Sequence, residues 1–223
     1  MNAKITQIRN IILDAKQHDC VSSQLTQMLA ERVDQLHYAI KLPPQEAADL
    51  LARFIVRYIS QVPEFIDAIT EISREAGIYE DVSPLLNIAS DYFLTPPDII
   101  GGHNQLEALL DESYLAHRFL EEINDRFMGF CGIPLAPMDM TRANVIAHEL
   151  IGEPFANELD QAVLFSAELL LDQCSFSGSK FNQYIALHKD RGWSQELKRW
   201  PCLTENLAIV LDFNHEDTPV TTH

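Results

Sequence analysis

Basic residues are scarce in this sequence. Among its 223 residues, 16 lysines and arginines stand against 33 aspartates and glutamates, which gives a formal net charge of −17. A surface with this excess of negative charge repels a phosphate backbone. We therefore expect no nucleic-acid partner, whereas cations, basic proteins and neutral small molecules are all compatible with the charge.

Cysteines and long apolar runs are scarce as well. The four cysteines lie far apart and form no CxxC pair, and the first residues, MNAKITQIRNIIL, lack the basic start and long apolar stretch of an export signal. This pattern favours reduced thiols in a cytoplasm. No run approaches the roughly 18 apolar residues that span a bilayer. The sequence thus predicts a cytoplasmic protein with no membrane partner.

Specific catalytic signatures are missing. The chain contains no glycine-rich phosphate loop with its lysine, no GxSxG motif and no kinase motif. The di-iron carboxylate pattern needs two Glu-x-x-His motifs on different helices, and neither is present. The segment ANVIAHELIGEP is not a zinc-protease motif, because Gly152 stands where the second histidine is required. We recognise no family motif that assigns a reaction, so the catalytic residues, if any, stay unknown.

What the sequence does contain is helical periodicity. Hydrophobic residues make up 47% of the chain, and along nearly its whole length they recur three and four residues apart, with glycine or proline at the joints. This pattern predicts an all-α fold. We expect a single compact domain of about eight to ten helices over residues 1–213, in orthogonal or bundle-like packing. A lobe boundary is possible near residues 95–102, and residues 214–223 are expected to form a flexible tail.

Prolines and glycines mark the expected helix ends in the first half of the chain. Pro63 suits the first turn of a helix, so we expect a new helix to start there. Gly77 is expected to end that helix. Ser83-Pro84 reads as a cap followed by a first-turn proline, which predicts a further short helix from this point.

Other boundaries follow from the apolar spacing. A helix is expected from Ser22 or Ser23 to about Ile40, another over residues 141–151, and a strongly apolar one from residue 154 to about 172. The run LAIVLDF at residues 207–213 fits a last helix and a short strand equally well, because periodicity does not separate the two over so few residues.

The richest candidate site lies on the helix predicted for residues 103–128. An α-helix turns 100° per residue, so one stripe of roughly a quarter of its circumference carries five polar side chains. These five are His103, Glu107, Tyr114, His117 and Glu121. An apolar stripe expected to face the core lies to one side: Leu109, Ala116, Leu120, Ile123 and Phe127. The other side, expected to face solvent, carries Asp111, Arg118, Glu122 and Asp125.

Two chemistries fit part of this stripe. His117 and Glu121 are spaced to bind one divalent metal ion, and His148 of the helix at residues 141–151 can complete the site if the two helices pack together. The same imidazole and carboxylate can act as a base and the group that orients it. His103, Glu107 and Tyr114 are further binding candidates. The competing interpretation is that His117 and Glu121 form only a solvent-exposed contact, which would stabilise the helix by about 0.2–0.5 kcal/mol.

Charge is distributed unevenly near the C-terminus. Residues 143–179 hold six acids and no lysine or arginine, whereas residues 180–199 hold five basic residues. Such neighbours can pair within the fold or stay solvated, or they can form a bipolar surface for self-association.

These observations leave three functions. The favoured one is a non-catalytic acidic all-α protein that acts through protein–protein interaction or self-association, with a protein partner or a homo-oligomer. The alternative is a metal-dependent or acid–base enzyme with a His/Glu site between helices. The third is a small-molecule carrier with an apolar pocket between helices and the polar stripe at its mouth.

Overall fold

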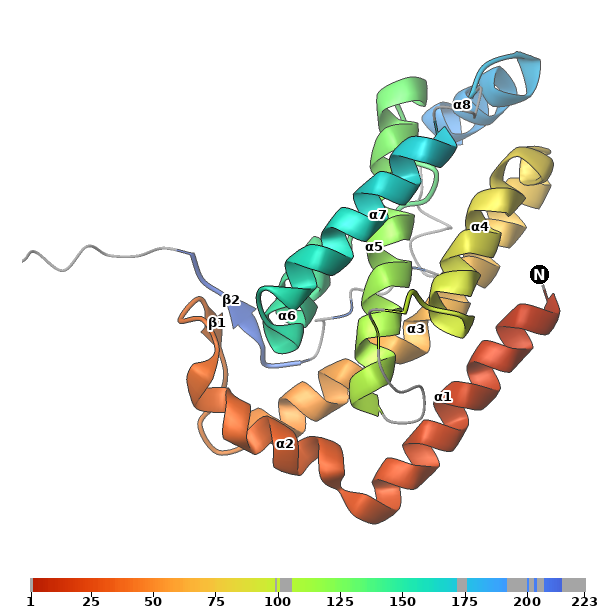
Figure 1. Cartoon of the computed structure of the whole chain (residues 1–223). Helices are drawn as coiled ribbons and strands as arrows, with labels where there is room; N and C mark the ends of the chain where they lie inside the picture. Colours follow the sequence, from red (N-terminus) through yellow and green to blue (C-terminus); the bar gives the residue numbers. More distant parts are fainter. Residues whose placement is uncertain are drawn as a thin grey trace, which may run out of the picture.

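Eight α-helices form nearly all of the regular structure in the described part of the chain (Figure 1). This computed structural model describes residues 2–98, 100, 106–171, 176–191, 200, 203 and 207–213. The helices are α1 (Asn2–Ser22), α2 (Gln24–Arg32), α3 (Ala47–Glu75), α4 (Tyr79–Leu94), α5 (Leu106–Cys131), α6 (Thr141–Ile151), α7 (Phe155–Leu171) and α8 (Ser179–Arg191). The predicted all-α fold is confirmed.

Helix α5 occupies the centre of the bundle, where α1, α3, α4, α6 and α7 all pack against it (Figure 1). The apolar stripe predicted for this helix is buried, from Leu109 to Phe127. The neighbouring stripe is buried too, since Tyr114 is 1% exposed and His117 is 0% exposed. Because helices cover α5 on several sides, the expectation of a solvated contact at His117 is wrong.

Helix α3 runs through Pro63 without interruption, so the prediction that Pro63 starts a separate helix is wrong. A proline inside a helix removes one backbone hydrogen bond and costs about 3 kcal/mol. The apolar spacing continues across it, and Ile59, Val62 and Ile66 are all fully buried. Each such side chain contributes roughly 1.5–3 kcal/mol on burial, so one continuous buried face outweighs the lost bond.

The junction between α3 and α4 is a tight turn at Gly77, where the sequence predicts a helix end. Gly77 has φ +69°, and the amide of Ile78 donates to the carbonyl oxygen of Ser73 at 2.9 Å while that of Gly77 donates to Arg74 at 3.0 Å. These two bonds satisfy the last carbonyls of α3. Helix α4 then begins at Tyr79, before the predicted start at Ser83-Pro84, and Pro84 lies inside it.

We expect Gly77→Ala to lower the free energy of unfolding by about 1 kcal/mol, because alanine disfavours the left-handed conformation. A new Cβ would meet no atom within 4 Å, so no steric clash contributes. The matched control is Gly129→Ala inside α5, where the space around a new Cβ is equally open. This substitution should raise the free energy of unfolding by about 0.5–1 kcal/mol, because alanine favours the helical conformation. Urea denaturation measures both, and equal effects of the two substitutions would contradict this account.

The run at residues 207–213 contains a strand rather than a helix. Strand β2 (Val210–Leu211) pairs antiparallel with β1 (Ile40–Lys41), and the amide of Asp212 donates to the carbonyl oxygen of Ala39 at 2.8 Å (Figure 1). The helix predicted to continue to about Ile40 therefore stops early: α2 ends at Arg32, and a 3₁₀ turn (Val33–Gln35) leads into β1.

The hydrophobic core is continuous across the possible lobe boundary at residues 95–102. Helices α4 and α5, on either side of it, pack against each other, and one buried cluster extends from Ile5 to Ile209. The described helices therefore form one compact domain. None of the helices in the described ranges has the length and apolar character needed to cross a membrane. The predicted tail at residues 214–223 lies outside the described residues.

Candidate functional site

His117 is a buried core residue. Its Nε2 lies 2.8 Å from the backbone carbonyl oxygen of Tyr58 on α3, to which it can only donate. The ring packs against the rings of Tyr58 and Phe65, with centroids 4.4 Å and 5.5 Å away. Burial lowers the pKa of His117 to about 4, and the hydrogen bond to Tyr58 opposes this only in part. The imidazole is therefore neutral at physiological pH.

Glu121 and His148 have other partners. Helix α6 supplies two hydrogen bonds to the Glu121 carboxylate, from Asn144 Nδ2 at 2.7 Å and Thr141 Oγ1 at 3.3 Å. His148 Nε2 lies 3.1 Å from Asn157 Oδ1. His117 faces α3 and Glu121 faces α6, because α5 is packed on both sides. In the described ranges no three His, Cys, Asp or Glu side chains are arranged to hold a metal ion, so the predicted combination of His117, Glu121 and His148 is not assembled there.

Tyr114 and Glu121 belong instead to a polar network that joins four helices. Its members are Tyr58, Tyr114, Arg118, Glu121, Asn144 and Asp160. Arg118 is at its centre, with Nε 2.9 Å from Asp160 Oδ1 on α7 and Nη1 hydrogen-bonded to Glu121. Tyr114 donates to Asp160 at 3.0 Å, and Tyr58 donates to Asn144 Oδ1 at 2.6 Å.

This polar network is internally satisfied. The two carboxylates raise the pKa of Arg118 despite its partial burial, and burial together with Asp160 raises the pKa of Tyr114. No proton moves easily in such an arrangement, because the guanidinium stays charged and the phenol stays neutral. A satisfied network in a low-dielectric interior holds its helices in register. Its role is to fix α6 and α7 against α5.

A cavity of about 210 Å³ lies beside the N-terminal half of α5, and it is lined by residues from α2, α3, α5, α6 and α7. Its apolar walls include Leu29, Ile55, Leu110, Leu150 and Phe155. Its charged lining residues, within the described part of the chain, are Arg32, Glu107 and Asp111. We call it the Asp111 cavity.

The Asp111 carboxyl has an altered protonation equilibrium. Its pKa is raised to about 7, mainly by burial and also by the neighbouring Glu107, while Arg32 acts in the opposite direction. A carboxyl group with a pKa near neutrality in a cavity is a common feature of binding and catalytic sites. The sequence placed Asp111 on the solvent side of its helix, and the side chain is indeed half-exposed, beside a cavity that residues of α2 and α6 also line.

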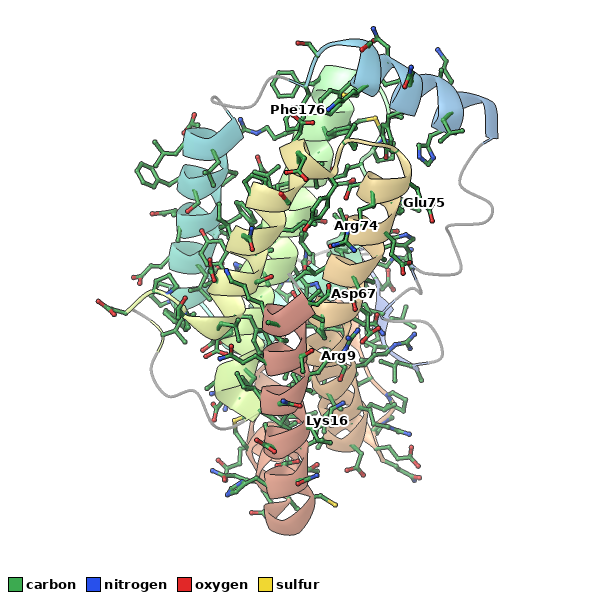
Figure 2. All side chains as sticks on the ribbon, turned by 90° about the vertical axis from the view of Figure 1, so that its right-hand side faces the viewer. Arg9, Lys16, Asp67, Arg74, Glu75 and Phe176 are labelled. Carbon is green, nitrogen blue, oxygen red and sulfur yellow. The ribbon has the colours of Figure 1, made fainter. Side chains whose placement is uncertain are left out.

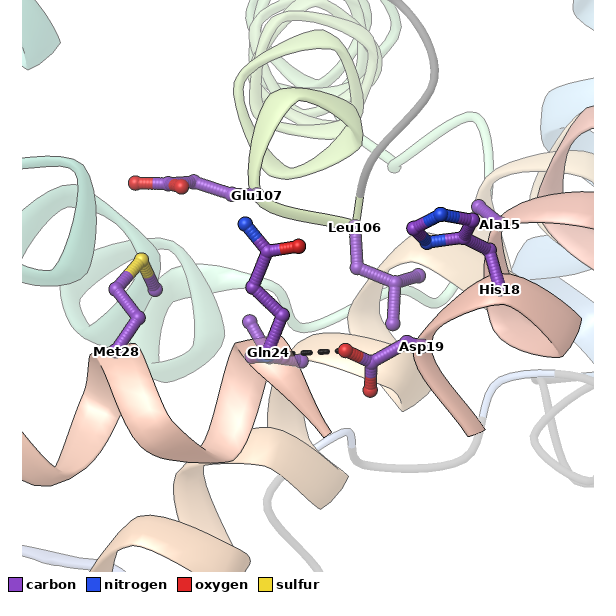
Figure 3. Close-up of a pocket in the computed structure, with 8 residues that line it drawn as sticks. Ala15, His18, Asp19, Gln24, Met28, Leu106 and Glu107 are labelled. Atoms are coloured by element: carbon purple, nitrogen blue, oxygen red, sulfur yellow. Dashed lines mark hydrogen bonds between the residues drawn. The ribbon is translucent and has the colours of Figure 1, made fainter. Parts of the chain in front are cut away.

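Of the remaining predicted binding residues, Glu107 lines two cavities. The second, of about 100 Å³, lies between α1, α2 and the start of α5, and shares Met28 and Glu107 with the Asp111 cavity (Figure 3). At its edge the amide of Leu25 donates to Asp19 Oδ1 at 2.9 Å. Asp19 thus caps α2, whereas Ser23, directly before the helix, makes no side-chain capping bond. His103 lies outside the described residues.

Helix α7 has apolar residues on both its inner and outer faces. Ala156, Leu159, Val163 and Ala167 are fully buried, in keeping with the packing of α7 on α5. On the other side, Leu164, Phe165 and Leu169 are 43%, 64% and 53% exposed. We call these three exposed residues the α7 patch.

Comparisons of the chain with protein-family models, with curated proteins and with solved structures find no match. Within the described residues, the α7 patch and the Asp111 cavity are therefore the features that indicate a function. One sequence signal pointed to the patch, since the run LFSAELLL is too apolar for a helix with a single buried face. No comparable signal pointed to Asp111.

Proposed function

We propose that this protein binds another protein through the α7 patch, and that the partner presents a basic amphipathic helix. The observation that supports this most is the exposure of Phe165 between Leu164 and Leu169. Single exposed apolar residues are ordinary on protein surfaces, whereas neighbouring large ones are typical of interaction sites. Phe165 and Leu169 are one turn apart and form a common surface for a partner.

Charge supports a basic partner. The patch lies within residues 143–179, which contain no lysine or arginine, and Glu158 and Glu168 on the same helix are exposed. Leucines on one side of a partner helix can cover Phe165 while its lysines pair with these acids, a common mode of helix recognition. Complementary charge also accelerates association and makes it sensitive to salt.

A synthetic amphipathic helix of leucine and lysine, about four turns long, is a suitable probe for this surface. We expect it to bind the wild-type protein, and the double variant Phe165→Ser/Leu169→Ser to bind it at least about tenfold more weakly, because the apolar contact is lost. Isothermal titration calorimetry at physiological salt measures both affinities. A peptide with glutamate in place of lysine should not bind.

The matched control is Leu13→Ser on α1, where the leucine is 52% exposed outside the α7 patch. It should leave the affinity unchanged. An equal loss in this control would mean that the peptide binds exposed apolar residues without preference for α7, and the proposal would fail. It would fail equally if the double variant bound like the wild type. Sedimentation of the wild type without peptide tests for self-association. In that case Lys180 and Lys189 of a second copy would pair with the acids beside the α7 patch.

A further inference from the structure

The Asp111 carboxyl lines its cavity without a polar partner from the protein. Within the described residues it accepts no hydrogen bond and forms no ion pair, although Glu107 and Arg32 influence it electrostatically. The Asp111 side chain is half-buried, and a carboxyl group that is partly removed from water without a cationic partner is costly to ionise. A positively charged group beside Asp111 would therefore favour its ionised form.

Arg32 does not supply that group, because it has other partners. Its Nη1 donates to the carbonyl oxygen of Leu150 at the end of α6, at 2.9 Å, and its Nη2 lies 3.4 Å from Glu107 Oε1. The guanidinium thus bridges α6 and α5 at the edge of the cavity. With Asp111 and Glu107 ionised, the charged lining sums to one net negative charge.

The rest of the lining is hydrocarbon. Leu29, Ile55, Leu110, Leu150 and Phe155 face a space of about 210 Å³. An apolar cavity of about 150 Å³ holds a benzene molecule, so this one has room for a six-carbon ring bearing one small polar group. An anionic ligand would meet two carboxylates here, and a neutral one would leave the charge of Asp111 unbalanced.

We propose that the Asp111 cavity binds a small organic cation, an alkylammonium ion whose ammonium group pairs with Asp111 and whose hydrocarbon part contacts the apolar wall. This site is separate from the α7 patch, and neither proposal depends on the other. The ammonium group would donate to the otherwise unpartnered carboxylate, and charge-assisted hydrogen bonds of this type are among the stronger ones in proteins.

Binding should depend on pH in a defined direction. An alkylamine stays protonated between about pH 6 and 8, as a lysine side chain does. Asp111, with a pKa of about 7, must lose its proton to pair with the ligand. Affinity should therefore rise from about pH 6 to 8, and binding near pH 7 should release protons. The other charged groups facing Asp111 from the described lining are Glu107 and Arg32.

The test uses cyclohexylamine and isothermal titration calorimetry at about pH 8, where Asp111 is ionised. We expect cyclohexylamine to bind the wild type, and Asp111→Asn, which keeps the shape of the side chain, to weaken binding at least about tenfold. Asp14→Asn, an exposed substitution on α1, is the control and should leave the affinity unchanged. Circular dichroism confirms that each variant is folded.

Two further ligands separate charge from shape. Cyclohexanol has the same ring without the charge, and cyclohexanecarboxylate carries the opposite charge; both should bind more weakly than the amine. The proposal is overturned if cyclohexylamine does not bind, if Asp111→Asn binds it as well as the wild type, or if the carboxylate binds more tightly. A calcium titration that competes with the amine would reassign the cavity to a metal ion.

Discussion

Replacing Arg118 with methionine should lower the free energy of unfolding by about 3 kcal/mol, because it leaves Glu121 and Asp160 without their shared cation. The two carboxylates are largely shielded, with side-chain exposures of 15% and 26%. Each keeps hydrogen bonds, Glu121 from Asn144 and Asp160 from Tyr114, so the loss comes mainly from uncompensated charge. Urea denaturation at neutral pH measures it.

The control is a second arginine that also bridges two carboxylates. Arg9 on α1 lies 2.6 Å from Asp67 and 3.1 Å from Glu64 on α3 (Figure 2). Its side chain is 45% exposed, against 22% for Arg118, and exposed ion pairs contribute about 0–1 kcal/mol. Arg9→Met should therefore cost less than about 1 kcal/mol. If the two substitutions have equal effects, the polar network does not hold α6 and α7 in place.

The network also predicts a specific rescue. Adding Glu121→Gln and Asp160→Asn to the Arg118 variant removes the unpaired negative charges while it keeps the shapes of the side chains. Much of the lost stability should return, since replacing every charge of a buried set is far less costly than removing one partner. Failure of this rescue would indicate that Arg118 acts through packing of its hydrocarbon chain instead.

Without added amine, Asp111→Asn should stabilise the protein more at about pH 8 than at about pH 4.5, by roughly 2–4 kcal/mol. The folded protein raises the pKa of Asp111 from 3.8 to about 7, so the carboxyl binds its proton more tightly in the folded than in the unfolded state. Ionisation of Asp111 therefore lowers the free energy of unfolding. This loss is absent below pH 4, grows between pH 4 and 7, and is complete above pH 7. Asparagine removes this loss.

Urea denaturation at the two pH values, for wild type and variant, gives the difference directly. Asp14→Asn on the exposed face of α1 is the reference for a general effect of removing one negative charge. A stability difference for Asp111→Asn that stays constant across this pH range would show that the carboxyl is not held in an unfavourable environment.

The helices themselves could be predicted from local sequence. The spacing of apolar residues placed a helix over residues 141–151, which is where α6 lies, and one from residue 154 to about 172, close to the bounds of α7. The predictions at Pro63 and Pro84 were wrong because proline favours the first turn of a helix only as a local preference, whereas buried residues on both sides of each proline stabilise α3 and α4 as continuous helices.

The candidate site was less accessible to such reasoning. Helical geometry placed His117 and Glu121 on one stripe, but their hydrogen-bond partners lie on α3 and α6, which are distant in sequence. Which side of a helix meets solvent depends on how many neighbours it has. Because α5 is central, Tyr114 and His117 are buried, and Asp111 faces a cavity. The burial of a polar residue on a central helix is a tertiary property that periodicity does not contain.

The most direct test of the proposed function locates the contact. Hydroxyl-radical footprinting with mass spectrometry labels exposed side chains, and it can be applied to the wild-type protein with and without the leucine–lysine peptide. We predict that Phe165 and Leu169 are labelled in the free protein and protected in the complex, while Leu13 on α1 is labelled equally in both. Binding of the peptide with unchanged labelling of Phe165 would contradict a partner site on α7.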